Sequence, residues 1–252
     1  FAALSRRMDA QSPDHRRLCG PLQKAQSLKL KSSVENGAIF TYTTSVMAIL
    51  EILKFPDPRL RLKCKPVDEV TPELASFAQD MMETMRSFHG IGLAAAQVNR
   101  QIRLLVLDTR PKENGRYKPE EMTELEQKIE QPMILFNPEI IDKKGKTTFD
   151  EGCLSVPTYF ETVERFDWIR VKALNEKGEA IEFETDGLLS ICIQHEIDHL
   201  DGKLFIDRLS PIKANRLKSK IKKFGYPDPS EEDDADEDGD LVGESVGSKS
   251  SL

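Results

Sequence analysis

The sequence has no long run of apolar residues, and none of its apolar stretches approaches the length of a membrane span. This absence predicts a soluble protein. The four cysteines, Cys19, Cys64, Cys153 and Cys192, lack the paired spacing of a small disulfide framework. We therefore expect a reducing compartment in which the cysteines remain thiols.

The centre of the chain has little net charge. Residues 1–46 carry a net charge of +4 and residues 228–252 a net charge of −9, so about −2 of the total of −7 remains for residues 47–227. This central region therefore offers no charge that would identify a partner. At 252 residues and 38% hydrophobic content, the chain is expected to form one folded domain at 47–227 with an extension at each end.

Both extensions lack the patterns of a folded segment. Residues 1–46 show no helical or strand periodicity and are interpreted as sequence upstream of a natural start at Met47, with an organelle-import leader as the alternative. Residues 228–252 contain ten acids, Gly, Ser and hardly any large apolar residue. Such a tail cannot bury enough surface to order itself and is expected to be disordered.

The run from His195 to His199 reads HEIDH, an HExxH pattern. Two histidines four apart on a helix share one face, so both imidazoles can bind one metal ion while Glu196 lies beside it. Cys153, some forty residues upstream, could supply a third ligand and leave the fourth position open. Three protein ligands and an open position are typical of a catalytic metal site.

The pattern is short enough to occur by chance in a solvated helix, but its surroundings argue against chance. The predicted helix begins near Asp186, ends at Gly202 and is almost wholly apolar before His195. An apolar helix is buried, and buried His and Glu side chains need partners that a metal ion provides. Cys192 could be a fourth ligand, but that would close the site, so we interpret it as a pocket or core thiol.

The remaining patterns predict an α+β fold. A helix at 72–88 begins with Thr71-Pro72 and carries a methionine-rich face that is expected to be core. Strands are predicted at 102–108, 133–141, 147–154, 160–164, 168–174 and 180–184, the last two as a hairpin. The charged stretch 112–131 is interpreted as an exposed loop with a short solvated helix. A basic helix at 211–224 is expected to turn Ile212, Leu217, Ile221 and Phe224 inward.

Three runs together resemble the signature motifs of the peptide deformylase family, in their usual order. They are GIGLAAAQ at 90–97, EGCLS at 151–155 and QHEIDH at 194–199. The resemblance covers roughly residues 49–210 and implies antiparallel strands around a central HExxH helix, with a packing helix before it and the basic helix after it. It also implies an enzyme that hydrolyses the N-formyl group of formylmethionyl nascent peptides and releases formate.

The resemblance assigns roles to individual residues. The metal ligands would be Cys153, His195 and His199, and Glu196 would be the general base and later the general acid. The side chain of Gln97 and the backbone N–H of Leu154 would form the oxyanion hole, and Gly92 and Gly152 would let substrate backbone approach. The methionine side chain would enter a pocket lined by the ring of His195 and by Ile91, Gly92, Phe149, Leu188, Ile191 and Cys192.

Some features depart from the family pattern or leave alternatives open. Residues 156–161 have no Arg where some bacterial members place one that touches substrate backbone, and Tyr159 is the suggested replacement. One divalent ion is expected, with Fe²⁺ favoured in the cell by the resemblance and Zn²⁺, Ni²⁺ or Co²⁺ able to substitute. We expect a bacterial cytoplasmic location and no membrane or DNA partner. The basic helix 211–224 could contact the ribosome, or it could be a solubilising face.

Two other functions are compatible with parts of the sequence. A zinc protease acting on internal peptide bonds would need a further ligand after His199, where only Asp201 and Asp207 are available, and would leave Cys153 unexplained. A degenerate domain that only docks on ribosomes is disfavoured because every expected ligand and Glu196 are present.

Overall fold

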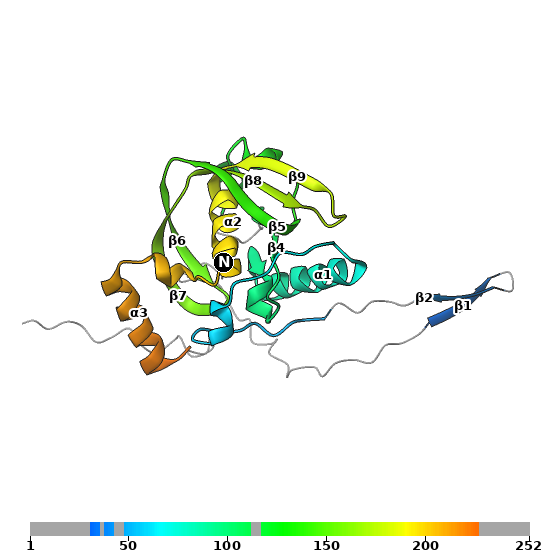
Figure 1. Ribbon diagram of the computed structural model, residues 1–252, viewed down its shortest axis with the longest axis horizontal. Helices are drawn as coiled ribbons and strands as arrows, with labels where there is room; N and C mark the ends of the chain where they lie inside the picture. Colours follow the sequence, from blue (N-terminus) through cyan, green and yellow to red (C-terminus); the bar gives the residue numbers. More distant parts are fainter. Residues whose placement is uncertain (1–30, 36–37, 43–47, 112–116, 227–252) are drawn as a thin grey trace, which may run out of the picture.

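The structure, a computed structural model, describes residues 31–35, 38–42, 48–111 and 117–226 (Figure 1). The acidic tail predicted at 228–252 and most of the predicted extension 1–46 lie outside these residues. The helices are α1 (Pro72–Ser87), α2 (Gly187–Leu200) and α3 (Pro211–Phe224). The strands are β1 (Lys31–Glu35), β2 (Ala38–Tyr42), β3 (Gly92–Ala94), β4 (Leu104–Leu107), β5 (Met133–Lys144), β6 (Thr147–Cys153), β7 (Val156–Arg165), β8 (Trp168–Leu174) and β9 (Ala180–Thr185).

The main sheet is antiparallel, with the strand order β3-β4-β5-β8-β9. All four residues of β4 are buried. Successive side chains of a strand point to opposite faces, so β4 is covered on both faces. Leu105 and Leu107 pack in the cluster that contains the apolar residues of α2, whereas Leu104 and Val106 pack with those of α1. The two helices therefore cover opposite faces of the sheet, and the predicted α+β fold is confirmed.

The antiparallel pair β6-β7 forms a second, two-stranded sheet. Figure 1 shows α2 in the middle of the molecule, with β6 and β7 on one side and the main sheet on the other. Beyond β6-β7 lies α3, whose Leu217 and Ile221 share a buried cluster with Cys153 and Val156. Helix α2 is thus enclosed by both sheets, as the resemblance implies for the HExxH helix.

Helix α1 begins as predicted. The Thr71 side chain accepts a hydrogen bond from the Leu74 N–H, and Pro72 occupies the first helical position, where a missing N–H costs nothing. Its methionines Met81, Met82 and Met85 are buried against the main sheet. The methionine-rich face is therefore core.

Three expectations are corrected. Residues 1–46 were expected to lack regular structure, but β1 and β2 pair as an antiparallel hairpin (Figure 1). The sequence between them is Asn36-Gly37, the pair favoured in two-residue hairpin turns. The strand β3 was not predicted, because three fully buried residues show no alternation.

The third correction concerns the basic helix, where Ile212 and Phe224 are 83% and 65% exposed. Helix α3 packs through Ala214, Leu217 and Ile221, a stripe on which Ile212 does not fall. Phe224 is the last residue of the helix, beyond the packed stripe.

Among the described residues, no helix is long and apolar enough to cross a membrane.

Candidate metal centre

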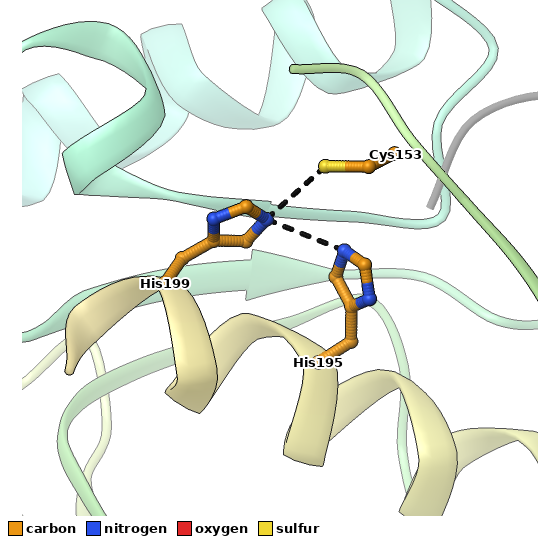
Figure 2. Close-up of side chains that lie close together, drawn as sticks. All are labelled: Cys153, His195 and His199. Atoms are coloured by element: carbon orange, nitrogen blue, oxygen red, sulfur yellow. Dashed lines mark hydrogen bonds between the residues drawn. The ribbon is translucent and has the colours of Figure 1, made fainter. Parts of the chain in front are cut away.

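Helix α2 carries two of the three expected ligands at the centre of the molecule. All of its residues from Leu188 to Leu200 are buried, as its largely apolar sequence predicts. His195 and His199 lie one turn apart, with their ring centroids separated by 5.0 Å. The Nε2 atoms of the two rings are 3.3 Å apart (Figure 2). The two imidazoles therefore present nitrogen atoms to the same point.

The third expected ligand comes from the end of β6. The register of β6 against β7 shifts between Glu151 and Cys153, a β-bulge of the kind that redirects side chains beside active sites. The Cys153 Sγ atom lies 3.2 Å from Nε2 of His199 (Figure 2). One donor atom from each of Cys153, His195 and His199 lies within 4.8 Å of the others.

The chemistry of this donor set fits a soft or borderline divalent cation. Burial lowers the pKa of His195 and His199 well below the ordinary value, so both rings are neutral and keep a lone pair. Burial also raises the pKa of the Cys153 thiol to about 11. A thiol in such surroundings becomes a thiolate when a cation coordinates it. Two imidazoles and one thiolate are ligands that Zn²⁺ and Fe²⁺ accept.

A charged network behind His195 was not predicted from the sequence. The Glu151 carboxylate is 2.8 Å from Nδ1 of His195 and accepts hydrogen bonds from Arg165 at 2.6 and 2.8 Å. Arg165 also donates to Asp198 at 2.6 Å, and Asp198 accepts from Nε of Arg208 at 2.9 Å. Because Glu151 accepts at Nδ1, the lone pair of His195 stays at Nε2, facing the other ligands.

Glu196 is fully buried beside the ligands. Burial raises its pKa to about 7, and the negative charge of Glu151 acts in the same direction. A Cβ atom on Gly92 would lie 2.5 Å from Oε1 of Glu196 and 2.7 Å from Sγ of Cys192. Glycine at position 92 therefore makes room for the Glu196 carboxylate itself, in addition to the substrate backbone for which the sequence suggested it.

Gln97 reaches the centre from the short 3₁₀ helix Ala95–Val98. Its Oε1 accepts a hydrogen bond from the Ala94 N–H at 2.8 Å, which fixes the orientation of the amide. Its Nε2 lies 3.1 Å from Oγ of Ser155 and 3.7 Å from Sγ of Cys153. Gln97 thus holds an N–H donor next to the thiol, and Leu154 follows Cys153 directly in the chain.

The expected pocket residues lie in two groups. Leu188 and Ile191 form a small cluster against which Ile91 and Phe149 pack. Cys192 faces Gly92, and its Sγ lies 3.6 Å from the carbonyl oxygen of Ile91. Gly152 is buried at the bulge between Glu151 and Cys153. Tyr117, which no sequence motif indicated, also packs against this apolar cluster.

Tyr159, which was suggested as a substrate contact, instead contacts the residues that follow α3. Its hydroxyl donates to the Gly225 carbonyl at 3.1 Å, and its ring meets Tyr226 edge to face. The Tyr226 hydroxyl in turn donates to the carbonyl of Phe55. Tyr159 therefore joins β7 to the segment after α3, and the structure gives no support for its replacing the missing Arg.

The fold and the three-donor centre are those of a metal-dependent hydrolase with an HExxH helix. Residues 49–215 match the family model for polypeptide deformylase. The chain is 48% identical to the peptide deformylase of Tolumonas auensis over 178 residues. These aligned residues make up 71% of this chain and 97% of that protein. This chain belongs to the peptide deformylase family.

Solved structures agree with the family assignment. The crystal structure of a peptide deformylase from Legionella pneumophila matches with a TM-score of 0.60 and 41% identity, over 70% of this chain and 95% of that one. The class I type b peptide deformylase from Acinetobacter baumannii, solved with Met-Ala-Ser bound, matches with a TM-score of 0.57 and 31% identity, over 65% of this chain and all of that one. The protein is accordingly a metal-dependent hydrolase that removes the N-formyl group from nascent polypeptides.

Proposed function

We propose that the catalytic centre consists of one divalent cation held by Cys153, His195 and His199, with Glu196 as the proton carrier. The observation that carries this proposal is the convergence of the three donor atoms within 4.8 Å at a buried point. A bound cation would supply the Lewis acid that makes water a nucleophile near neutral pH.

Glu196 is suited to accept the proton of the attacking water and pass it to the departing amine. A carboxyl group with a pKa near 7 can be either base or acid at physiological pH, which is what such a shuttle needs. Formally, the formyl C–N bond breaks, a C–O bond forms, and the water proton ends on the new amino terminus. The products are formate and a peptide with a free N-terminal methionine.

Gln97 and the Leu154 N–H are proposed to stabilise the negative charge that develops on the formyl oxygen. The Gln97 amide is held in place by Ala94 and Ser155, so its orientation is fixed before charge appears. Removing one such donor costs about 2.7–4 kcal/mol of transition-state stabilisation in comparable sites. Gln97→Ala should therefore lower kcat by about 10²-fold or more.

The methionine side chain of the substrate is proposed to enter the apolar pocket lined by the group around Leu188 and Ile191 together with the ring of His195. The lining residues are Ile91, Gly92, Phe149, Leu188, Ile191 and Cys192. Few of them carry polar groups, which suits a thioether. Gly152, at the bulge, is proposed to leave room for substrate backbone.

Formate release from formyl-Met-Ala-Ser, measured beside cleavage of an internally quenched peptide, tests the proposal. We expect formate release without internal cleavage. Glu196→Ala should keep the bound metal and lose most turnover, because only the proton carrier is removed. Full turnover in a metal-loaded Glu196→Ala variant would contradict the role of this residue, and internal cleavage would favour the protease alternative.

Fe²⁺ is proposed as the cation in the cell, with Zn²⁺, Ni²⁺ or Co²⁺ able to replace it. The donor set suits Zn²⁺ as well, so identification requires purification without oxygen followed by elemental analysis. Cys153→Asp, which keeps an oxygen ligand, should change both metal content and rate. Unchanged content and rate would show that Cys153 does not coordinate.

The bacterial cytoplasm, where formylated chains are made, is the proposed location, and the basic helix α3 is the proposed ribosome contact. Its cations Arg216, Lys220, Lys222 and Lys223 are exposed, while the apolar stripe faces the protein. Reversing the charge of Lys220 and Lys222 should weaken co-sedimentation with ribosomes and leave formate release unchanged. Equal co-sedimentation of the charge-reversed variant and the unsubstituted chain would exclude this contact.

A further inference from the structure

The charged stretch after Pro111 was expected to be an exposed loop with a short solvated helix, but its described part packs against the start of α2. Glu126, in the short 3₁₀ helix Glu126–Lys128, is fully buried. Its Oε1 accepts hydrogen bonds from the Leu189 N–H at 3.0 Å and from the Thr109 hydroxyl at 3.1 Å. A carboxylate from a distant segment therefore satisfies an N–H donor in the first turn of α2, where negative charge is favourable.

The approach of Glu126 to α2 is close, and the local backbone accommodates it. The side chain of Asp186, the residue before α2, forms no cap, and the Thr123 hydroxyl donates to its carboxylate. Gly187 has a φ of +60°, and a Cβ atom there would lie 2.8 Å from Oε2 of Glu126. Glycine both adopts this conformation easily and leaves room for the carboxylate.

The same carboxylate holds Tyr117. The Tyr117 hydroxyl lies 2.5 Å from Oε2 of Glu126 and 3.1 Å from the Glu121 carbonyl oxygen. The ring packs, partly buried, against Leu188 and Ile191 of α2. Its position is thus determined from both ends, by hydrogen bonds at the hydroxyl and by apolar contact at the ring.

The place of Tyr117 along α2 relates it to the metal centre. Ile191 precedes His195 by four residues and Leu188 precedes it by seven, so these three side chains follow one face of the helix. Seven residues correspond to about 10 Å along the axis. Glu126 contacts α2 at Gly187 and Leu189, so the Tyr117 hydroxyl that it holds lies near the start of the helix, the end remote from His195 and His199, while the Tyr117 ring packs against Leu188 and Ile191.

We infer that Tyr117 forms the far wall of the pocket for the first side chain of the substrate, and so sets the length of side chain that the enzyme accepts. This inference rests on the proposed function of the pocket. In this role Tyr117 is a specificity-determining residue, and Glu126 is the residue that positions it. The ligand class concerned is the N-formyl peptide whose first side chain is apolar, unbranched and about as long as that of methionine.

The test compares kcat/KM for formyl-Met-Ala-Ser with kcat/KM for the same peptide carrying 2-aminooctanoic acid, a longer unbranched residue, at the first position. In Tyr117→Ala we expect the ratio to shift toward the longer substrate by roughly tenfold or more, the usual effect of lengthening an apolar pocket. Tyr117→Phe keeps the ring and should leave the ratio close to that of the unsubstituted chain. Tyr117→Trp should shift the ratio in the opposite direction.

Phe77→Ala is the matched control, because Phe77 is also a partly buried ring with a polar neighbour, Arg100, but packs in the α1 cluster. It should leave the substrate ratio unchanged even where it lowers stability. An unchanged ratio in active Tyr117→Ala and Tyr117→Trp, or an equal shift in Phe77→Ala, would overturn the inference alone. Absence of formate release by the unsubstituted chain would instead overturn the proposed function, and this inference with it.

Discussion

Replacement of Arg165 by methionine tests whether the buried charge network supports both the fold and the metal centre. The Arg165 side chain is 1% exposed and lies between Glu151, which is 0% exposed, and Asp198, which is 6% exposed. Methionine keeps an unbranched apolar side chain at this position and removes the guanidinium group with its charge. After the substitution Asp198 still pairs with Arg208, but Glu151 retains only the ring nitrogen of His195 among these partners.

The expected cost follows from leaving a buried carboxylate without its cation. Removing one partner of a buried ion pair destabilises a protein by about 3–5 kcal/mol. In a domain of this size each kcal/mol lowers Tm by about 2–4 °C, so Arg165→Met should lower Tm by about 6–20 °C. Glu151 also orients His195, and loss of such support typically lowers metal affinity by about 10–100-fold.

The measurements are thermal unfolding of the metal-loaded protein by circular dichroism and metal affinity by competition with a chelator. Arg170→Met is the control, because Arg170 pairs with Glu184 on the surface, where their side chains are 38% and 42% exposed. An exposed pair adds little to stability, so this variant should melt close to the unsubstituted chain. Similar melting temperatures for the two variants would refute the reasoning, as would unchanged metal affinity in Arg165→Met.

Three further predictions concern Gly92, Glu126 and the cation. Gly92→Ala should lower kcat/KM for formyl-Met-Ala-Ser by about 10²-fold, because its Cβ would displace the Glu196 carboxylate, and full activity would contradict this. Burial raises the pKa of Glu126 above the ordinary value of a glutamate, so the folded state binds the carboxyl proton more tightly than the unfolded state, and the stability that this proton contributes is lost as pH rises. The melting temperature of Glu126→Gln, relative to the unsubstituted chain, should therefore increase as the pH rises from below the ordinary glutamate pKa of about 4.3 toward neutrality, and a constant difference would exclude the effect. Removing the cation with a chelator should abolish formate release and lower Tm, with both restored by added Zn²⁺; activity in protein shown by elemental analysis to lack metal would contradict a cation-dependent mechanism.

The sequence allowed prediction of those elements whose pattern repeats along the chain. Helix α1 follows its capping residues and apolar periodicity, and the hairpin β8-β9 follows its alternation and turn. The three residues expected to bind the metal could be named because HExxH has a required spacing on a helix and Cys153 lies in a second motif, and the structure brings their donor atoms within 4.8 Å of one another. These signals are local, and each is contained in a few consecutive residues.

The remaining features depend on contacts between distant segments. In the sequence, Arg165 is indistinguishable from the other charged residues near it. No neighbouring residue indicates that it pairs with Glu151 and Asp198. Glu126 lies in a stretch whose average composition is that of an exposed loop, although this one carboxylate is buried. Composition describes a segment as a whole, whereas burial of a single side chain is decided by tertiary packing.

The burial of α2 explains why the network behind the ligands is charged and balanced. A helix that is fully enclosed has no water to solvate Asp198, so the carboxylate requires a cation within hydrogen-bond distance. Arg165 provides it, but Arg165 is itself buried and needs Glu151 as a second acceptor. Glu151 then has an oxygen available for Nδ1 of His195, which directs the Nε2 lone pair toward Cys153 and His199. The charges of Glu151, Arg165, Asp198 and Arg208 sum to zero, so the network behind the neutral His195 carries no net charge. Replacing a member of this network should therefore change stability and metal affinity together. A substitution that changes only one of the two is expected only at a residue outside the network.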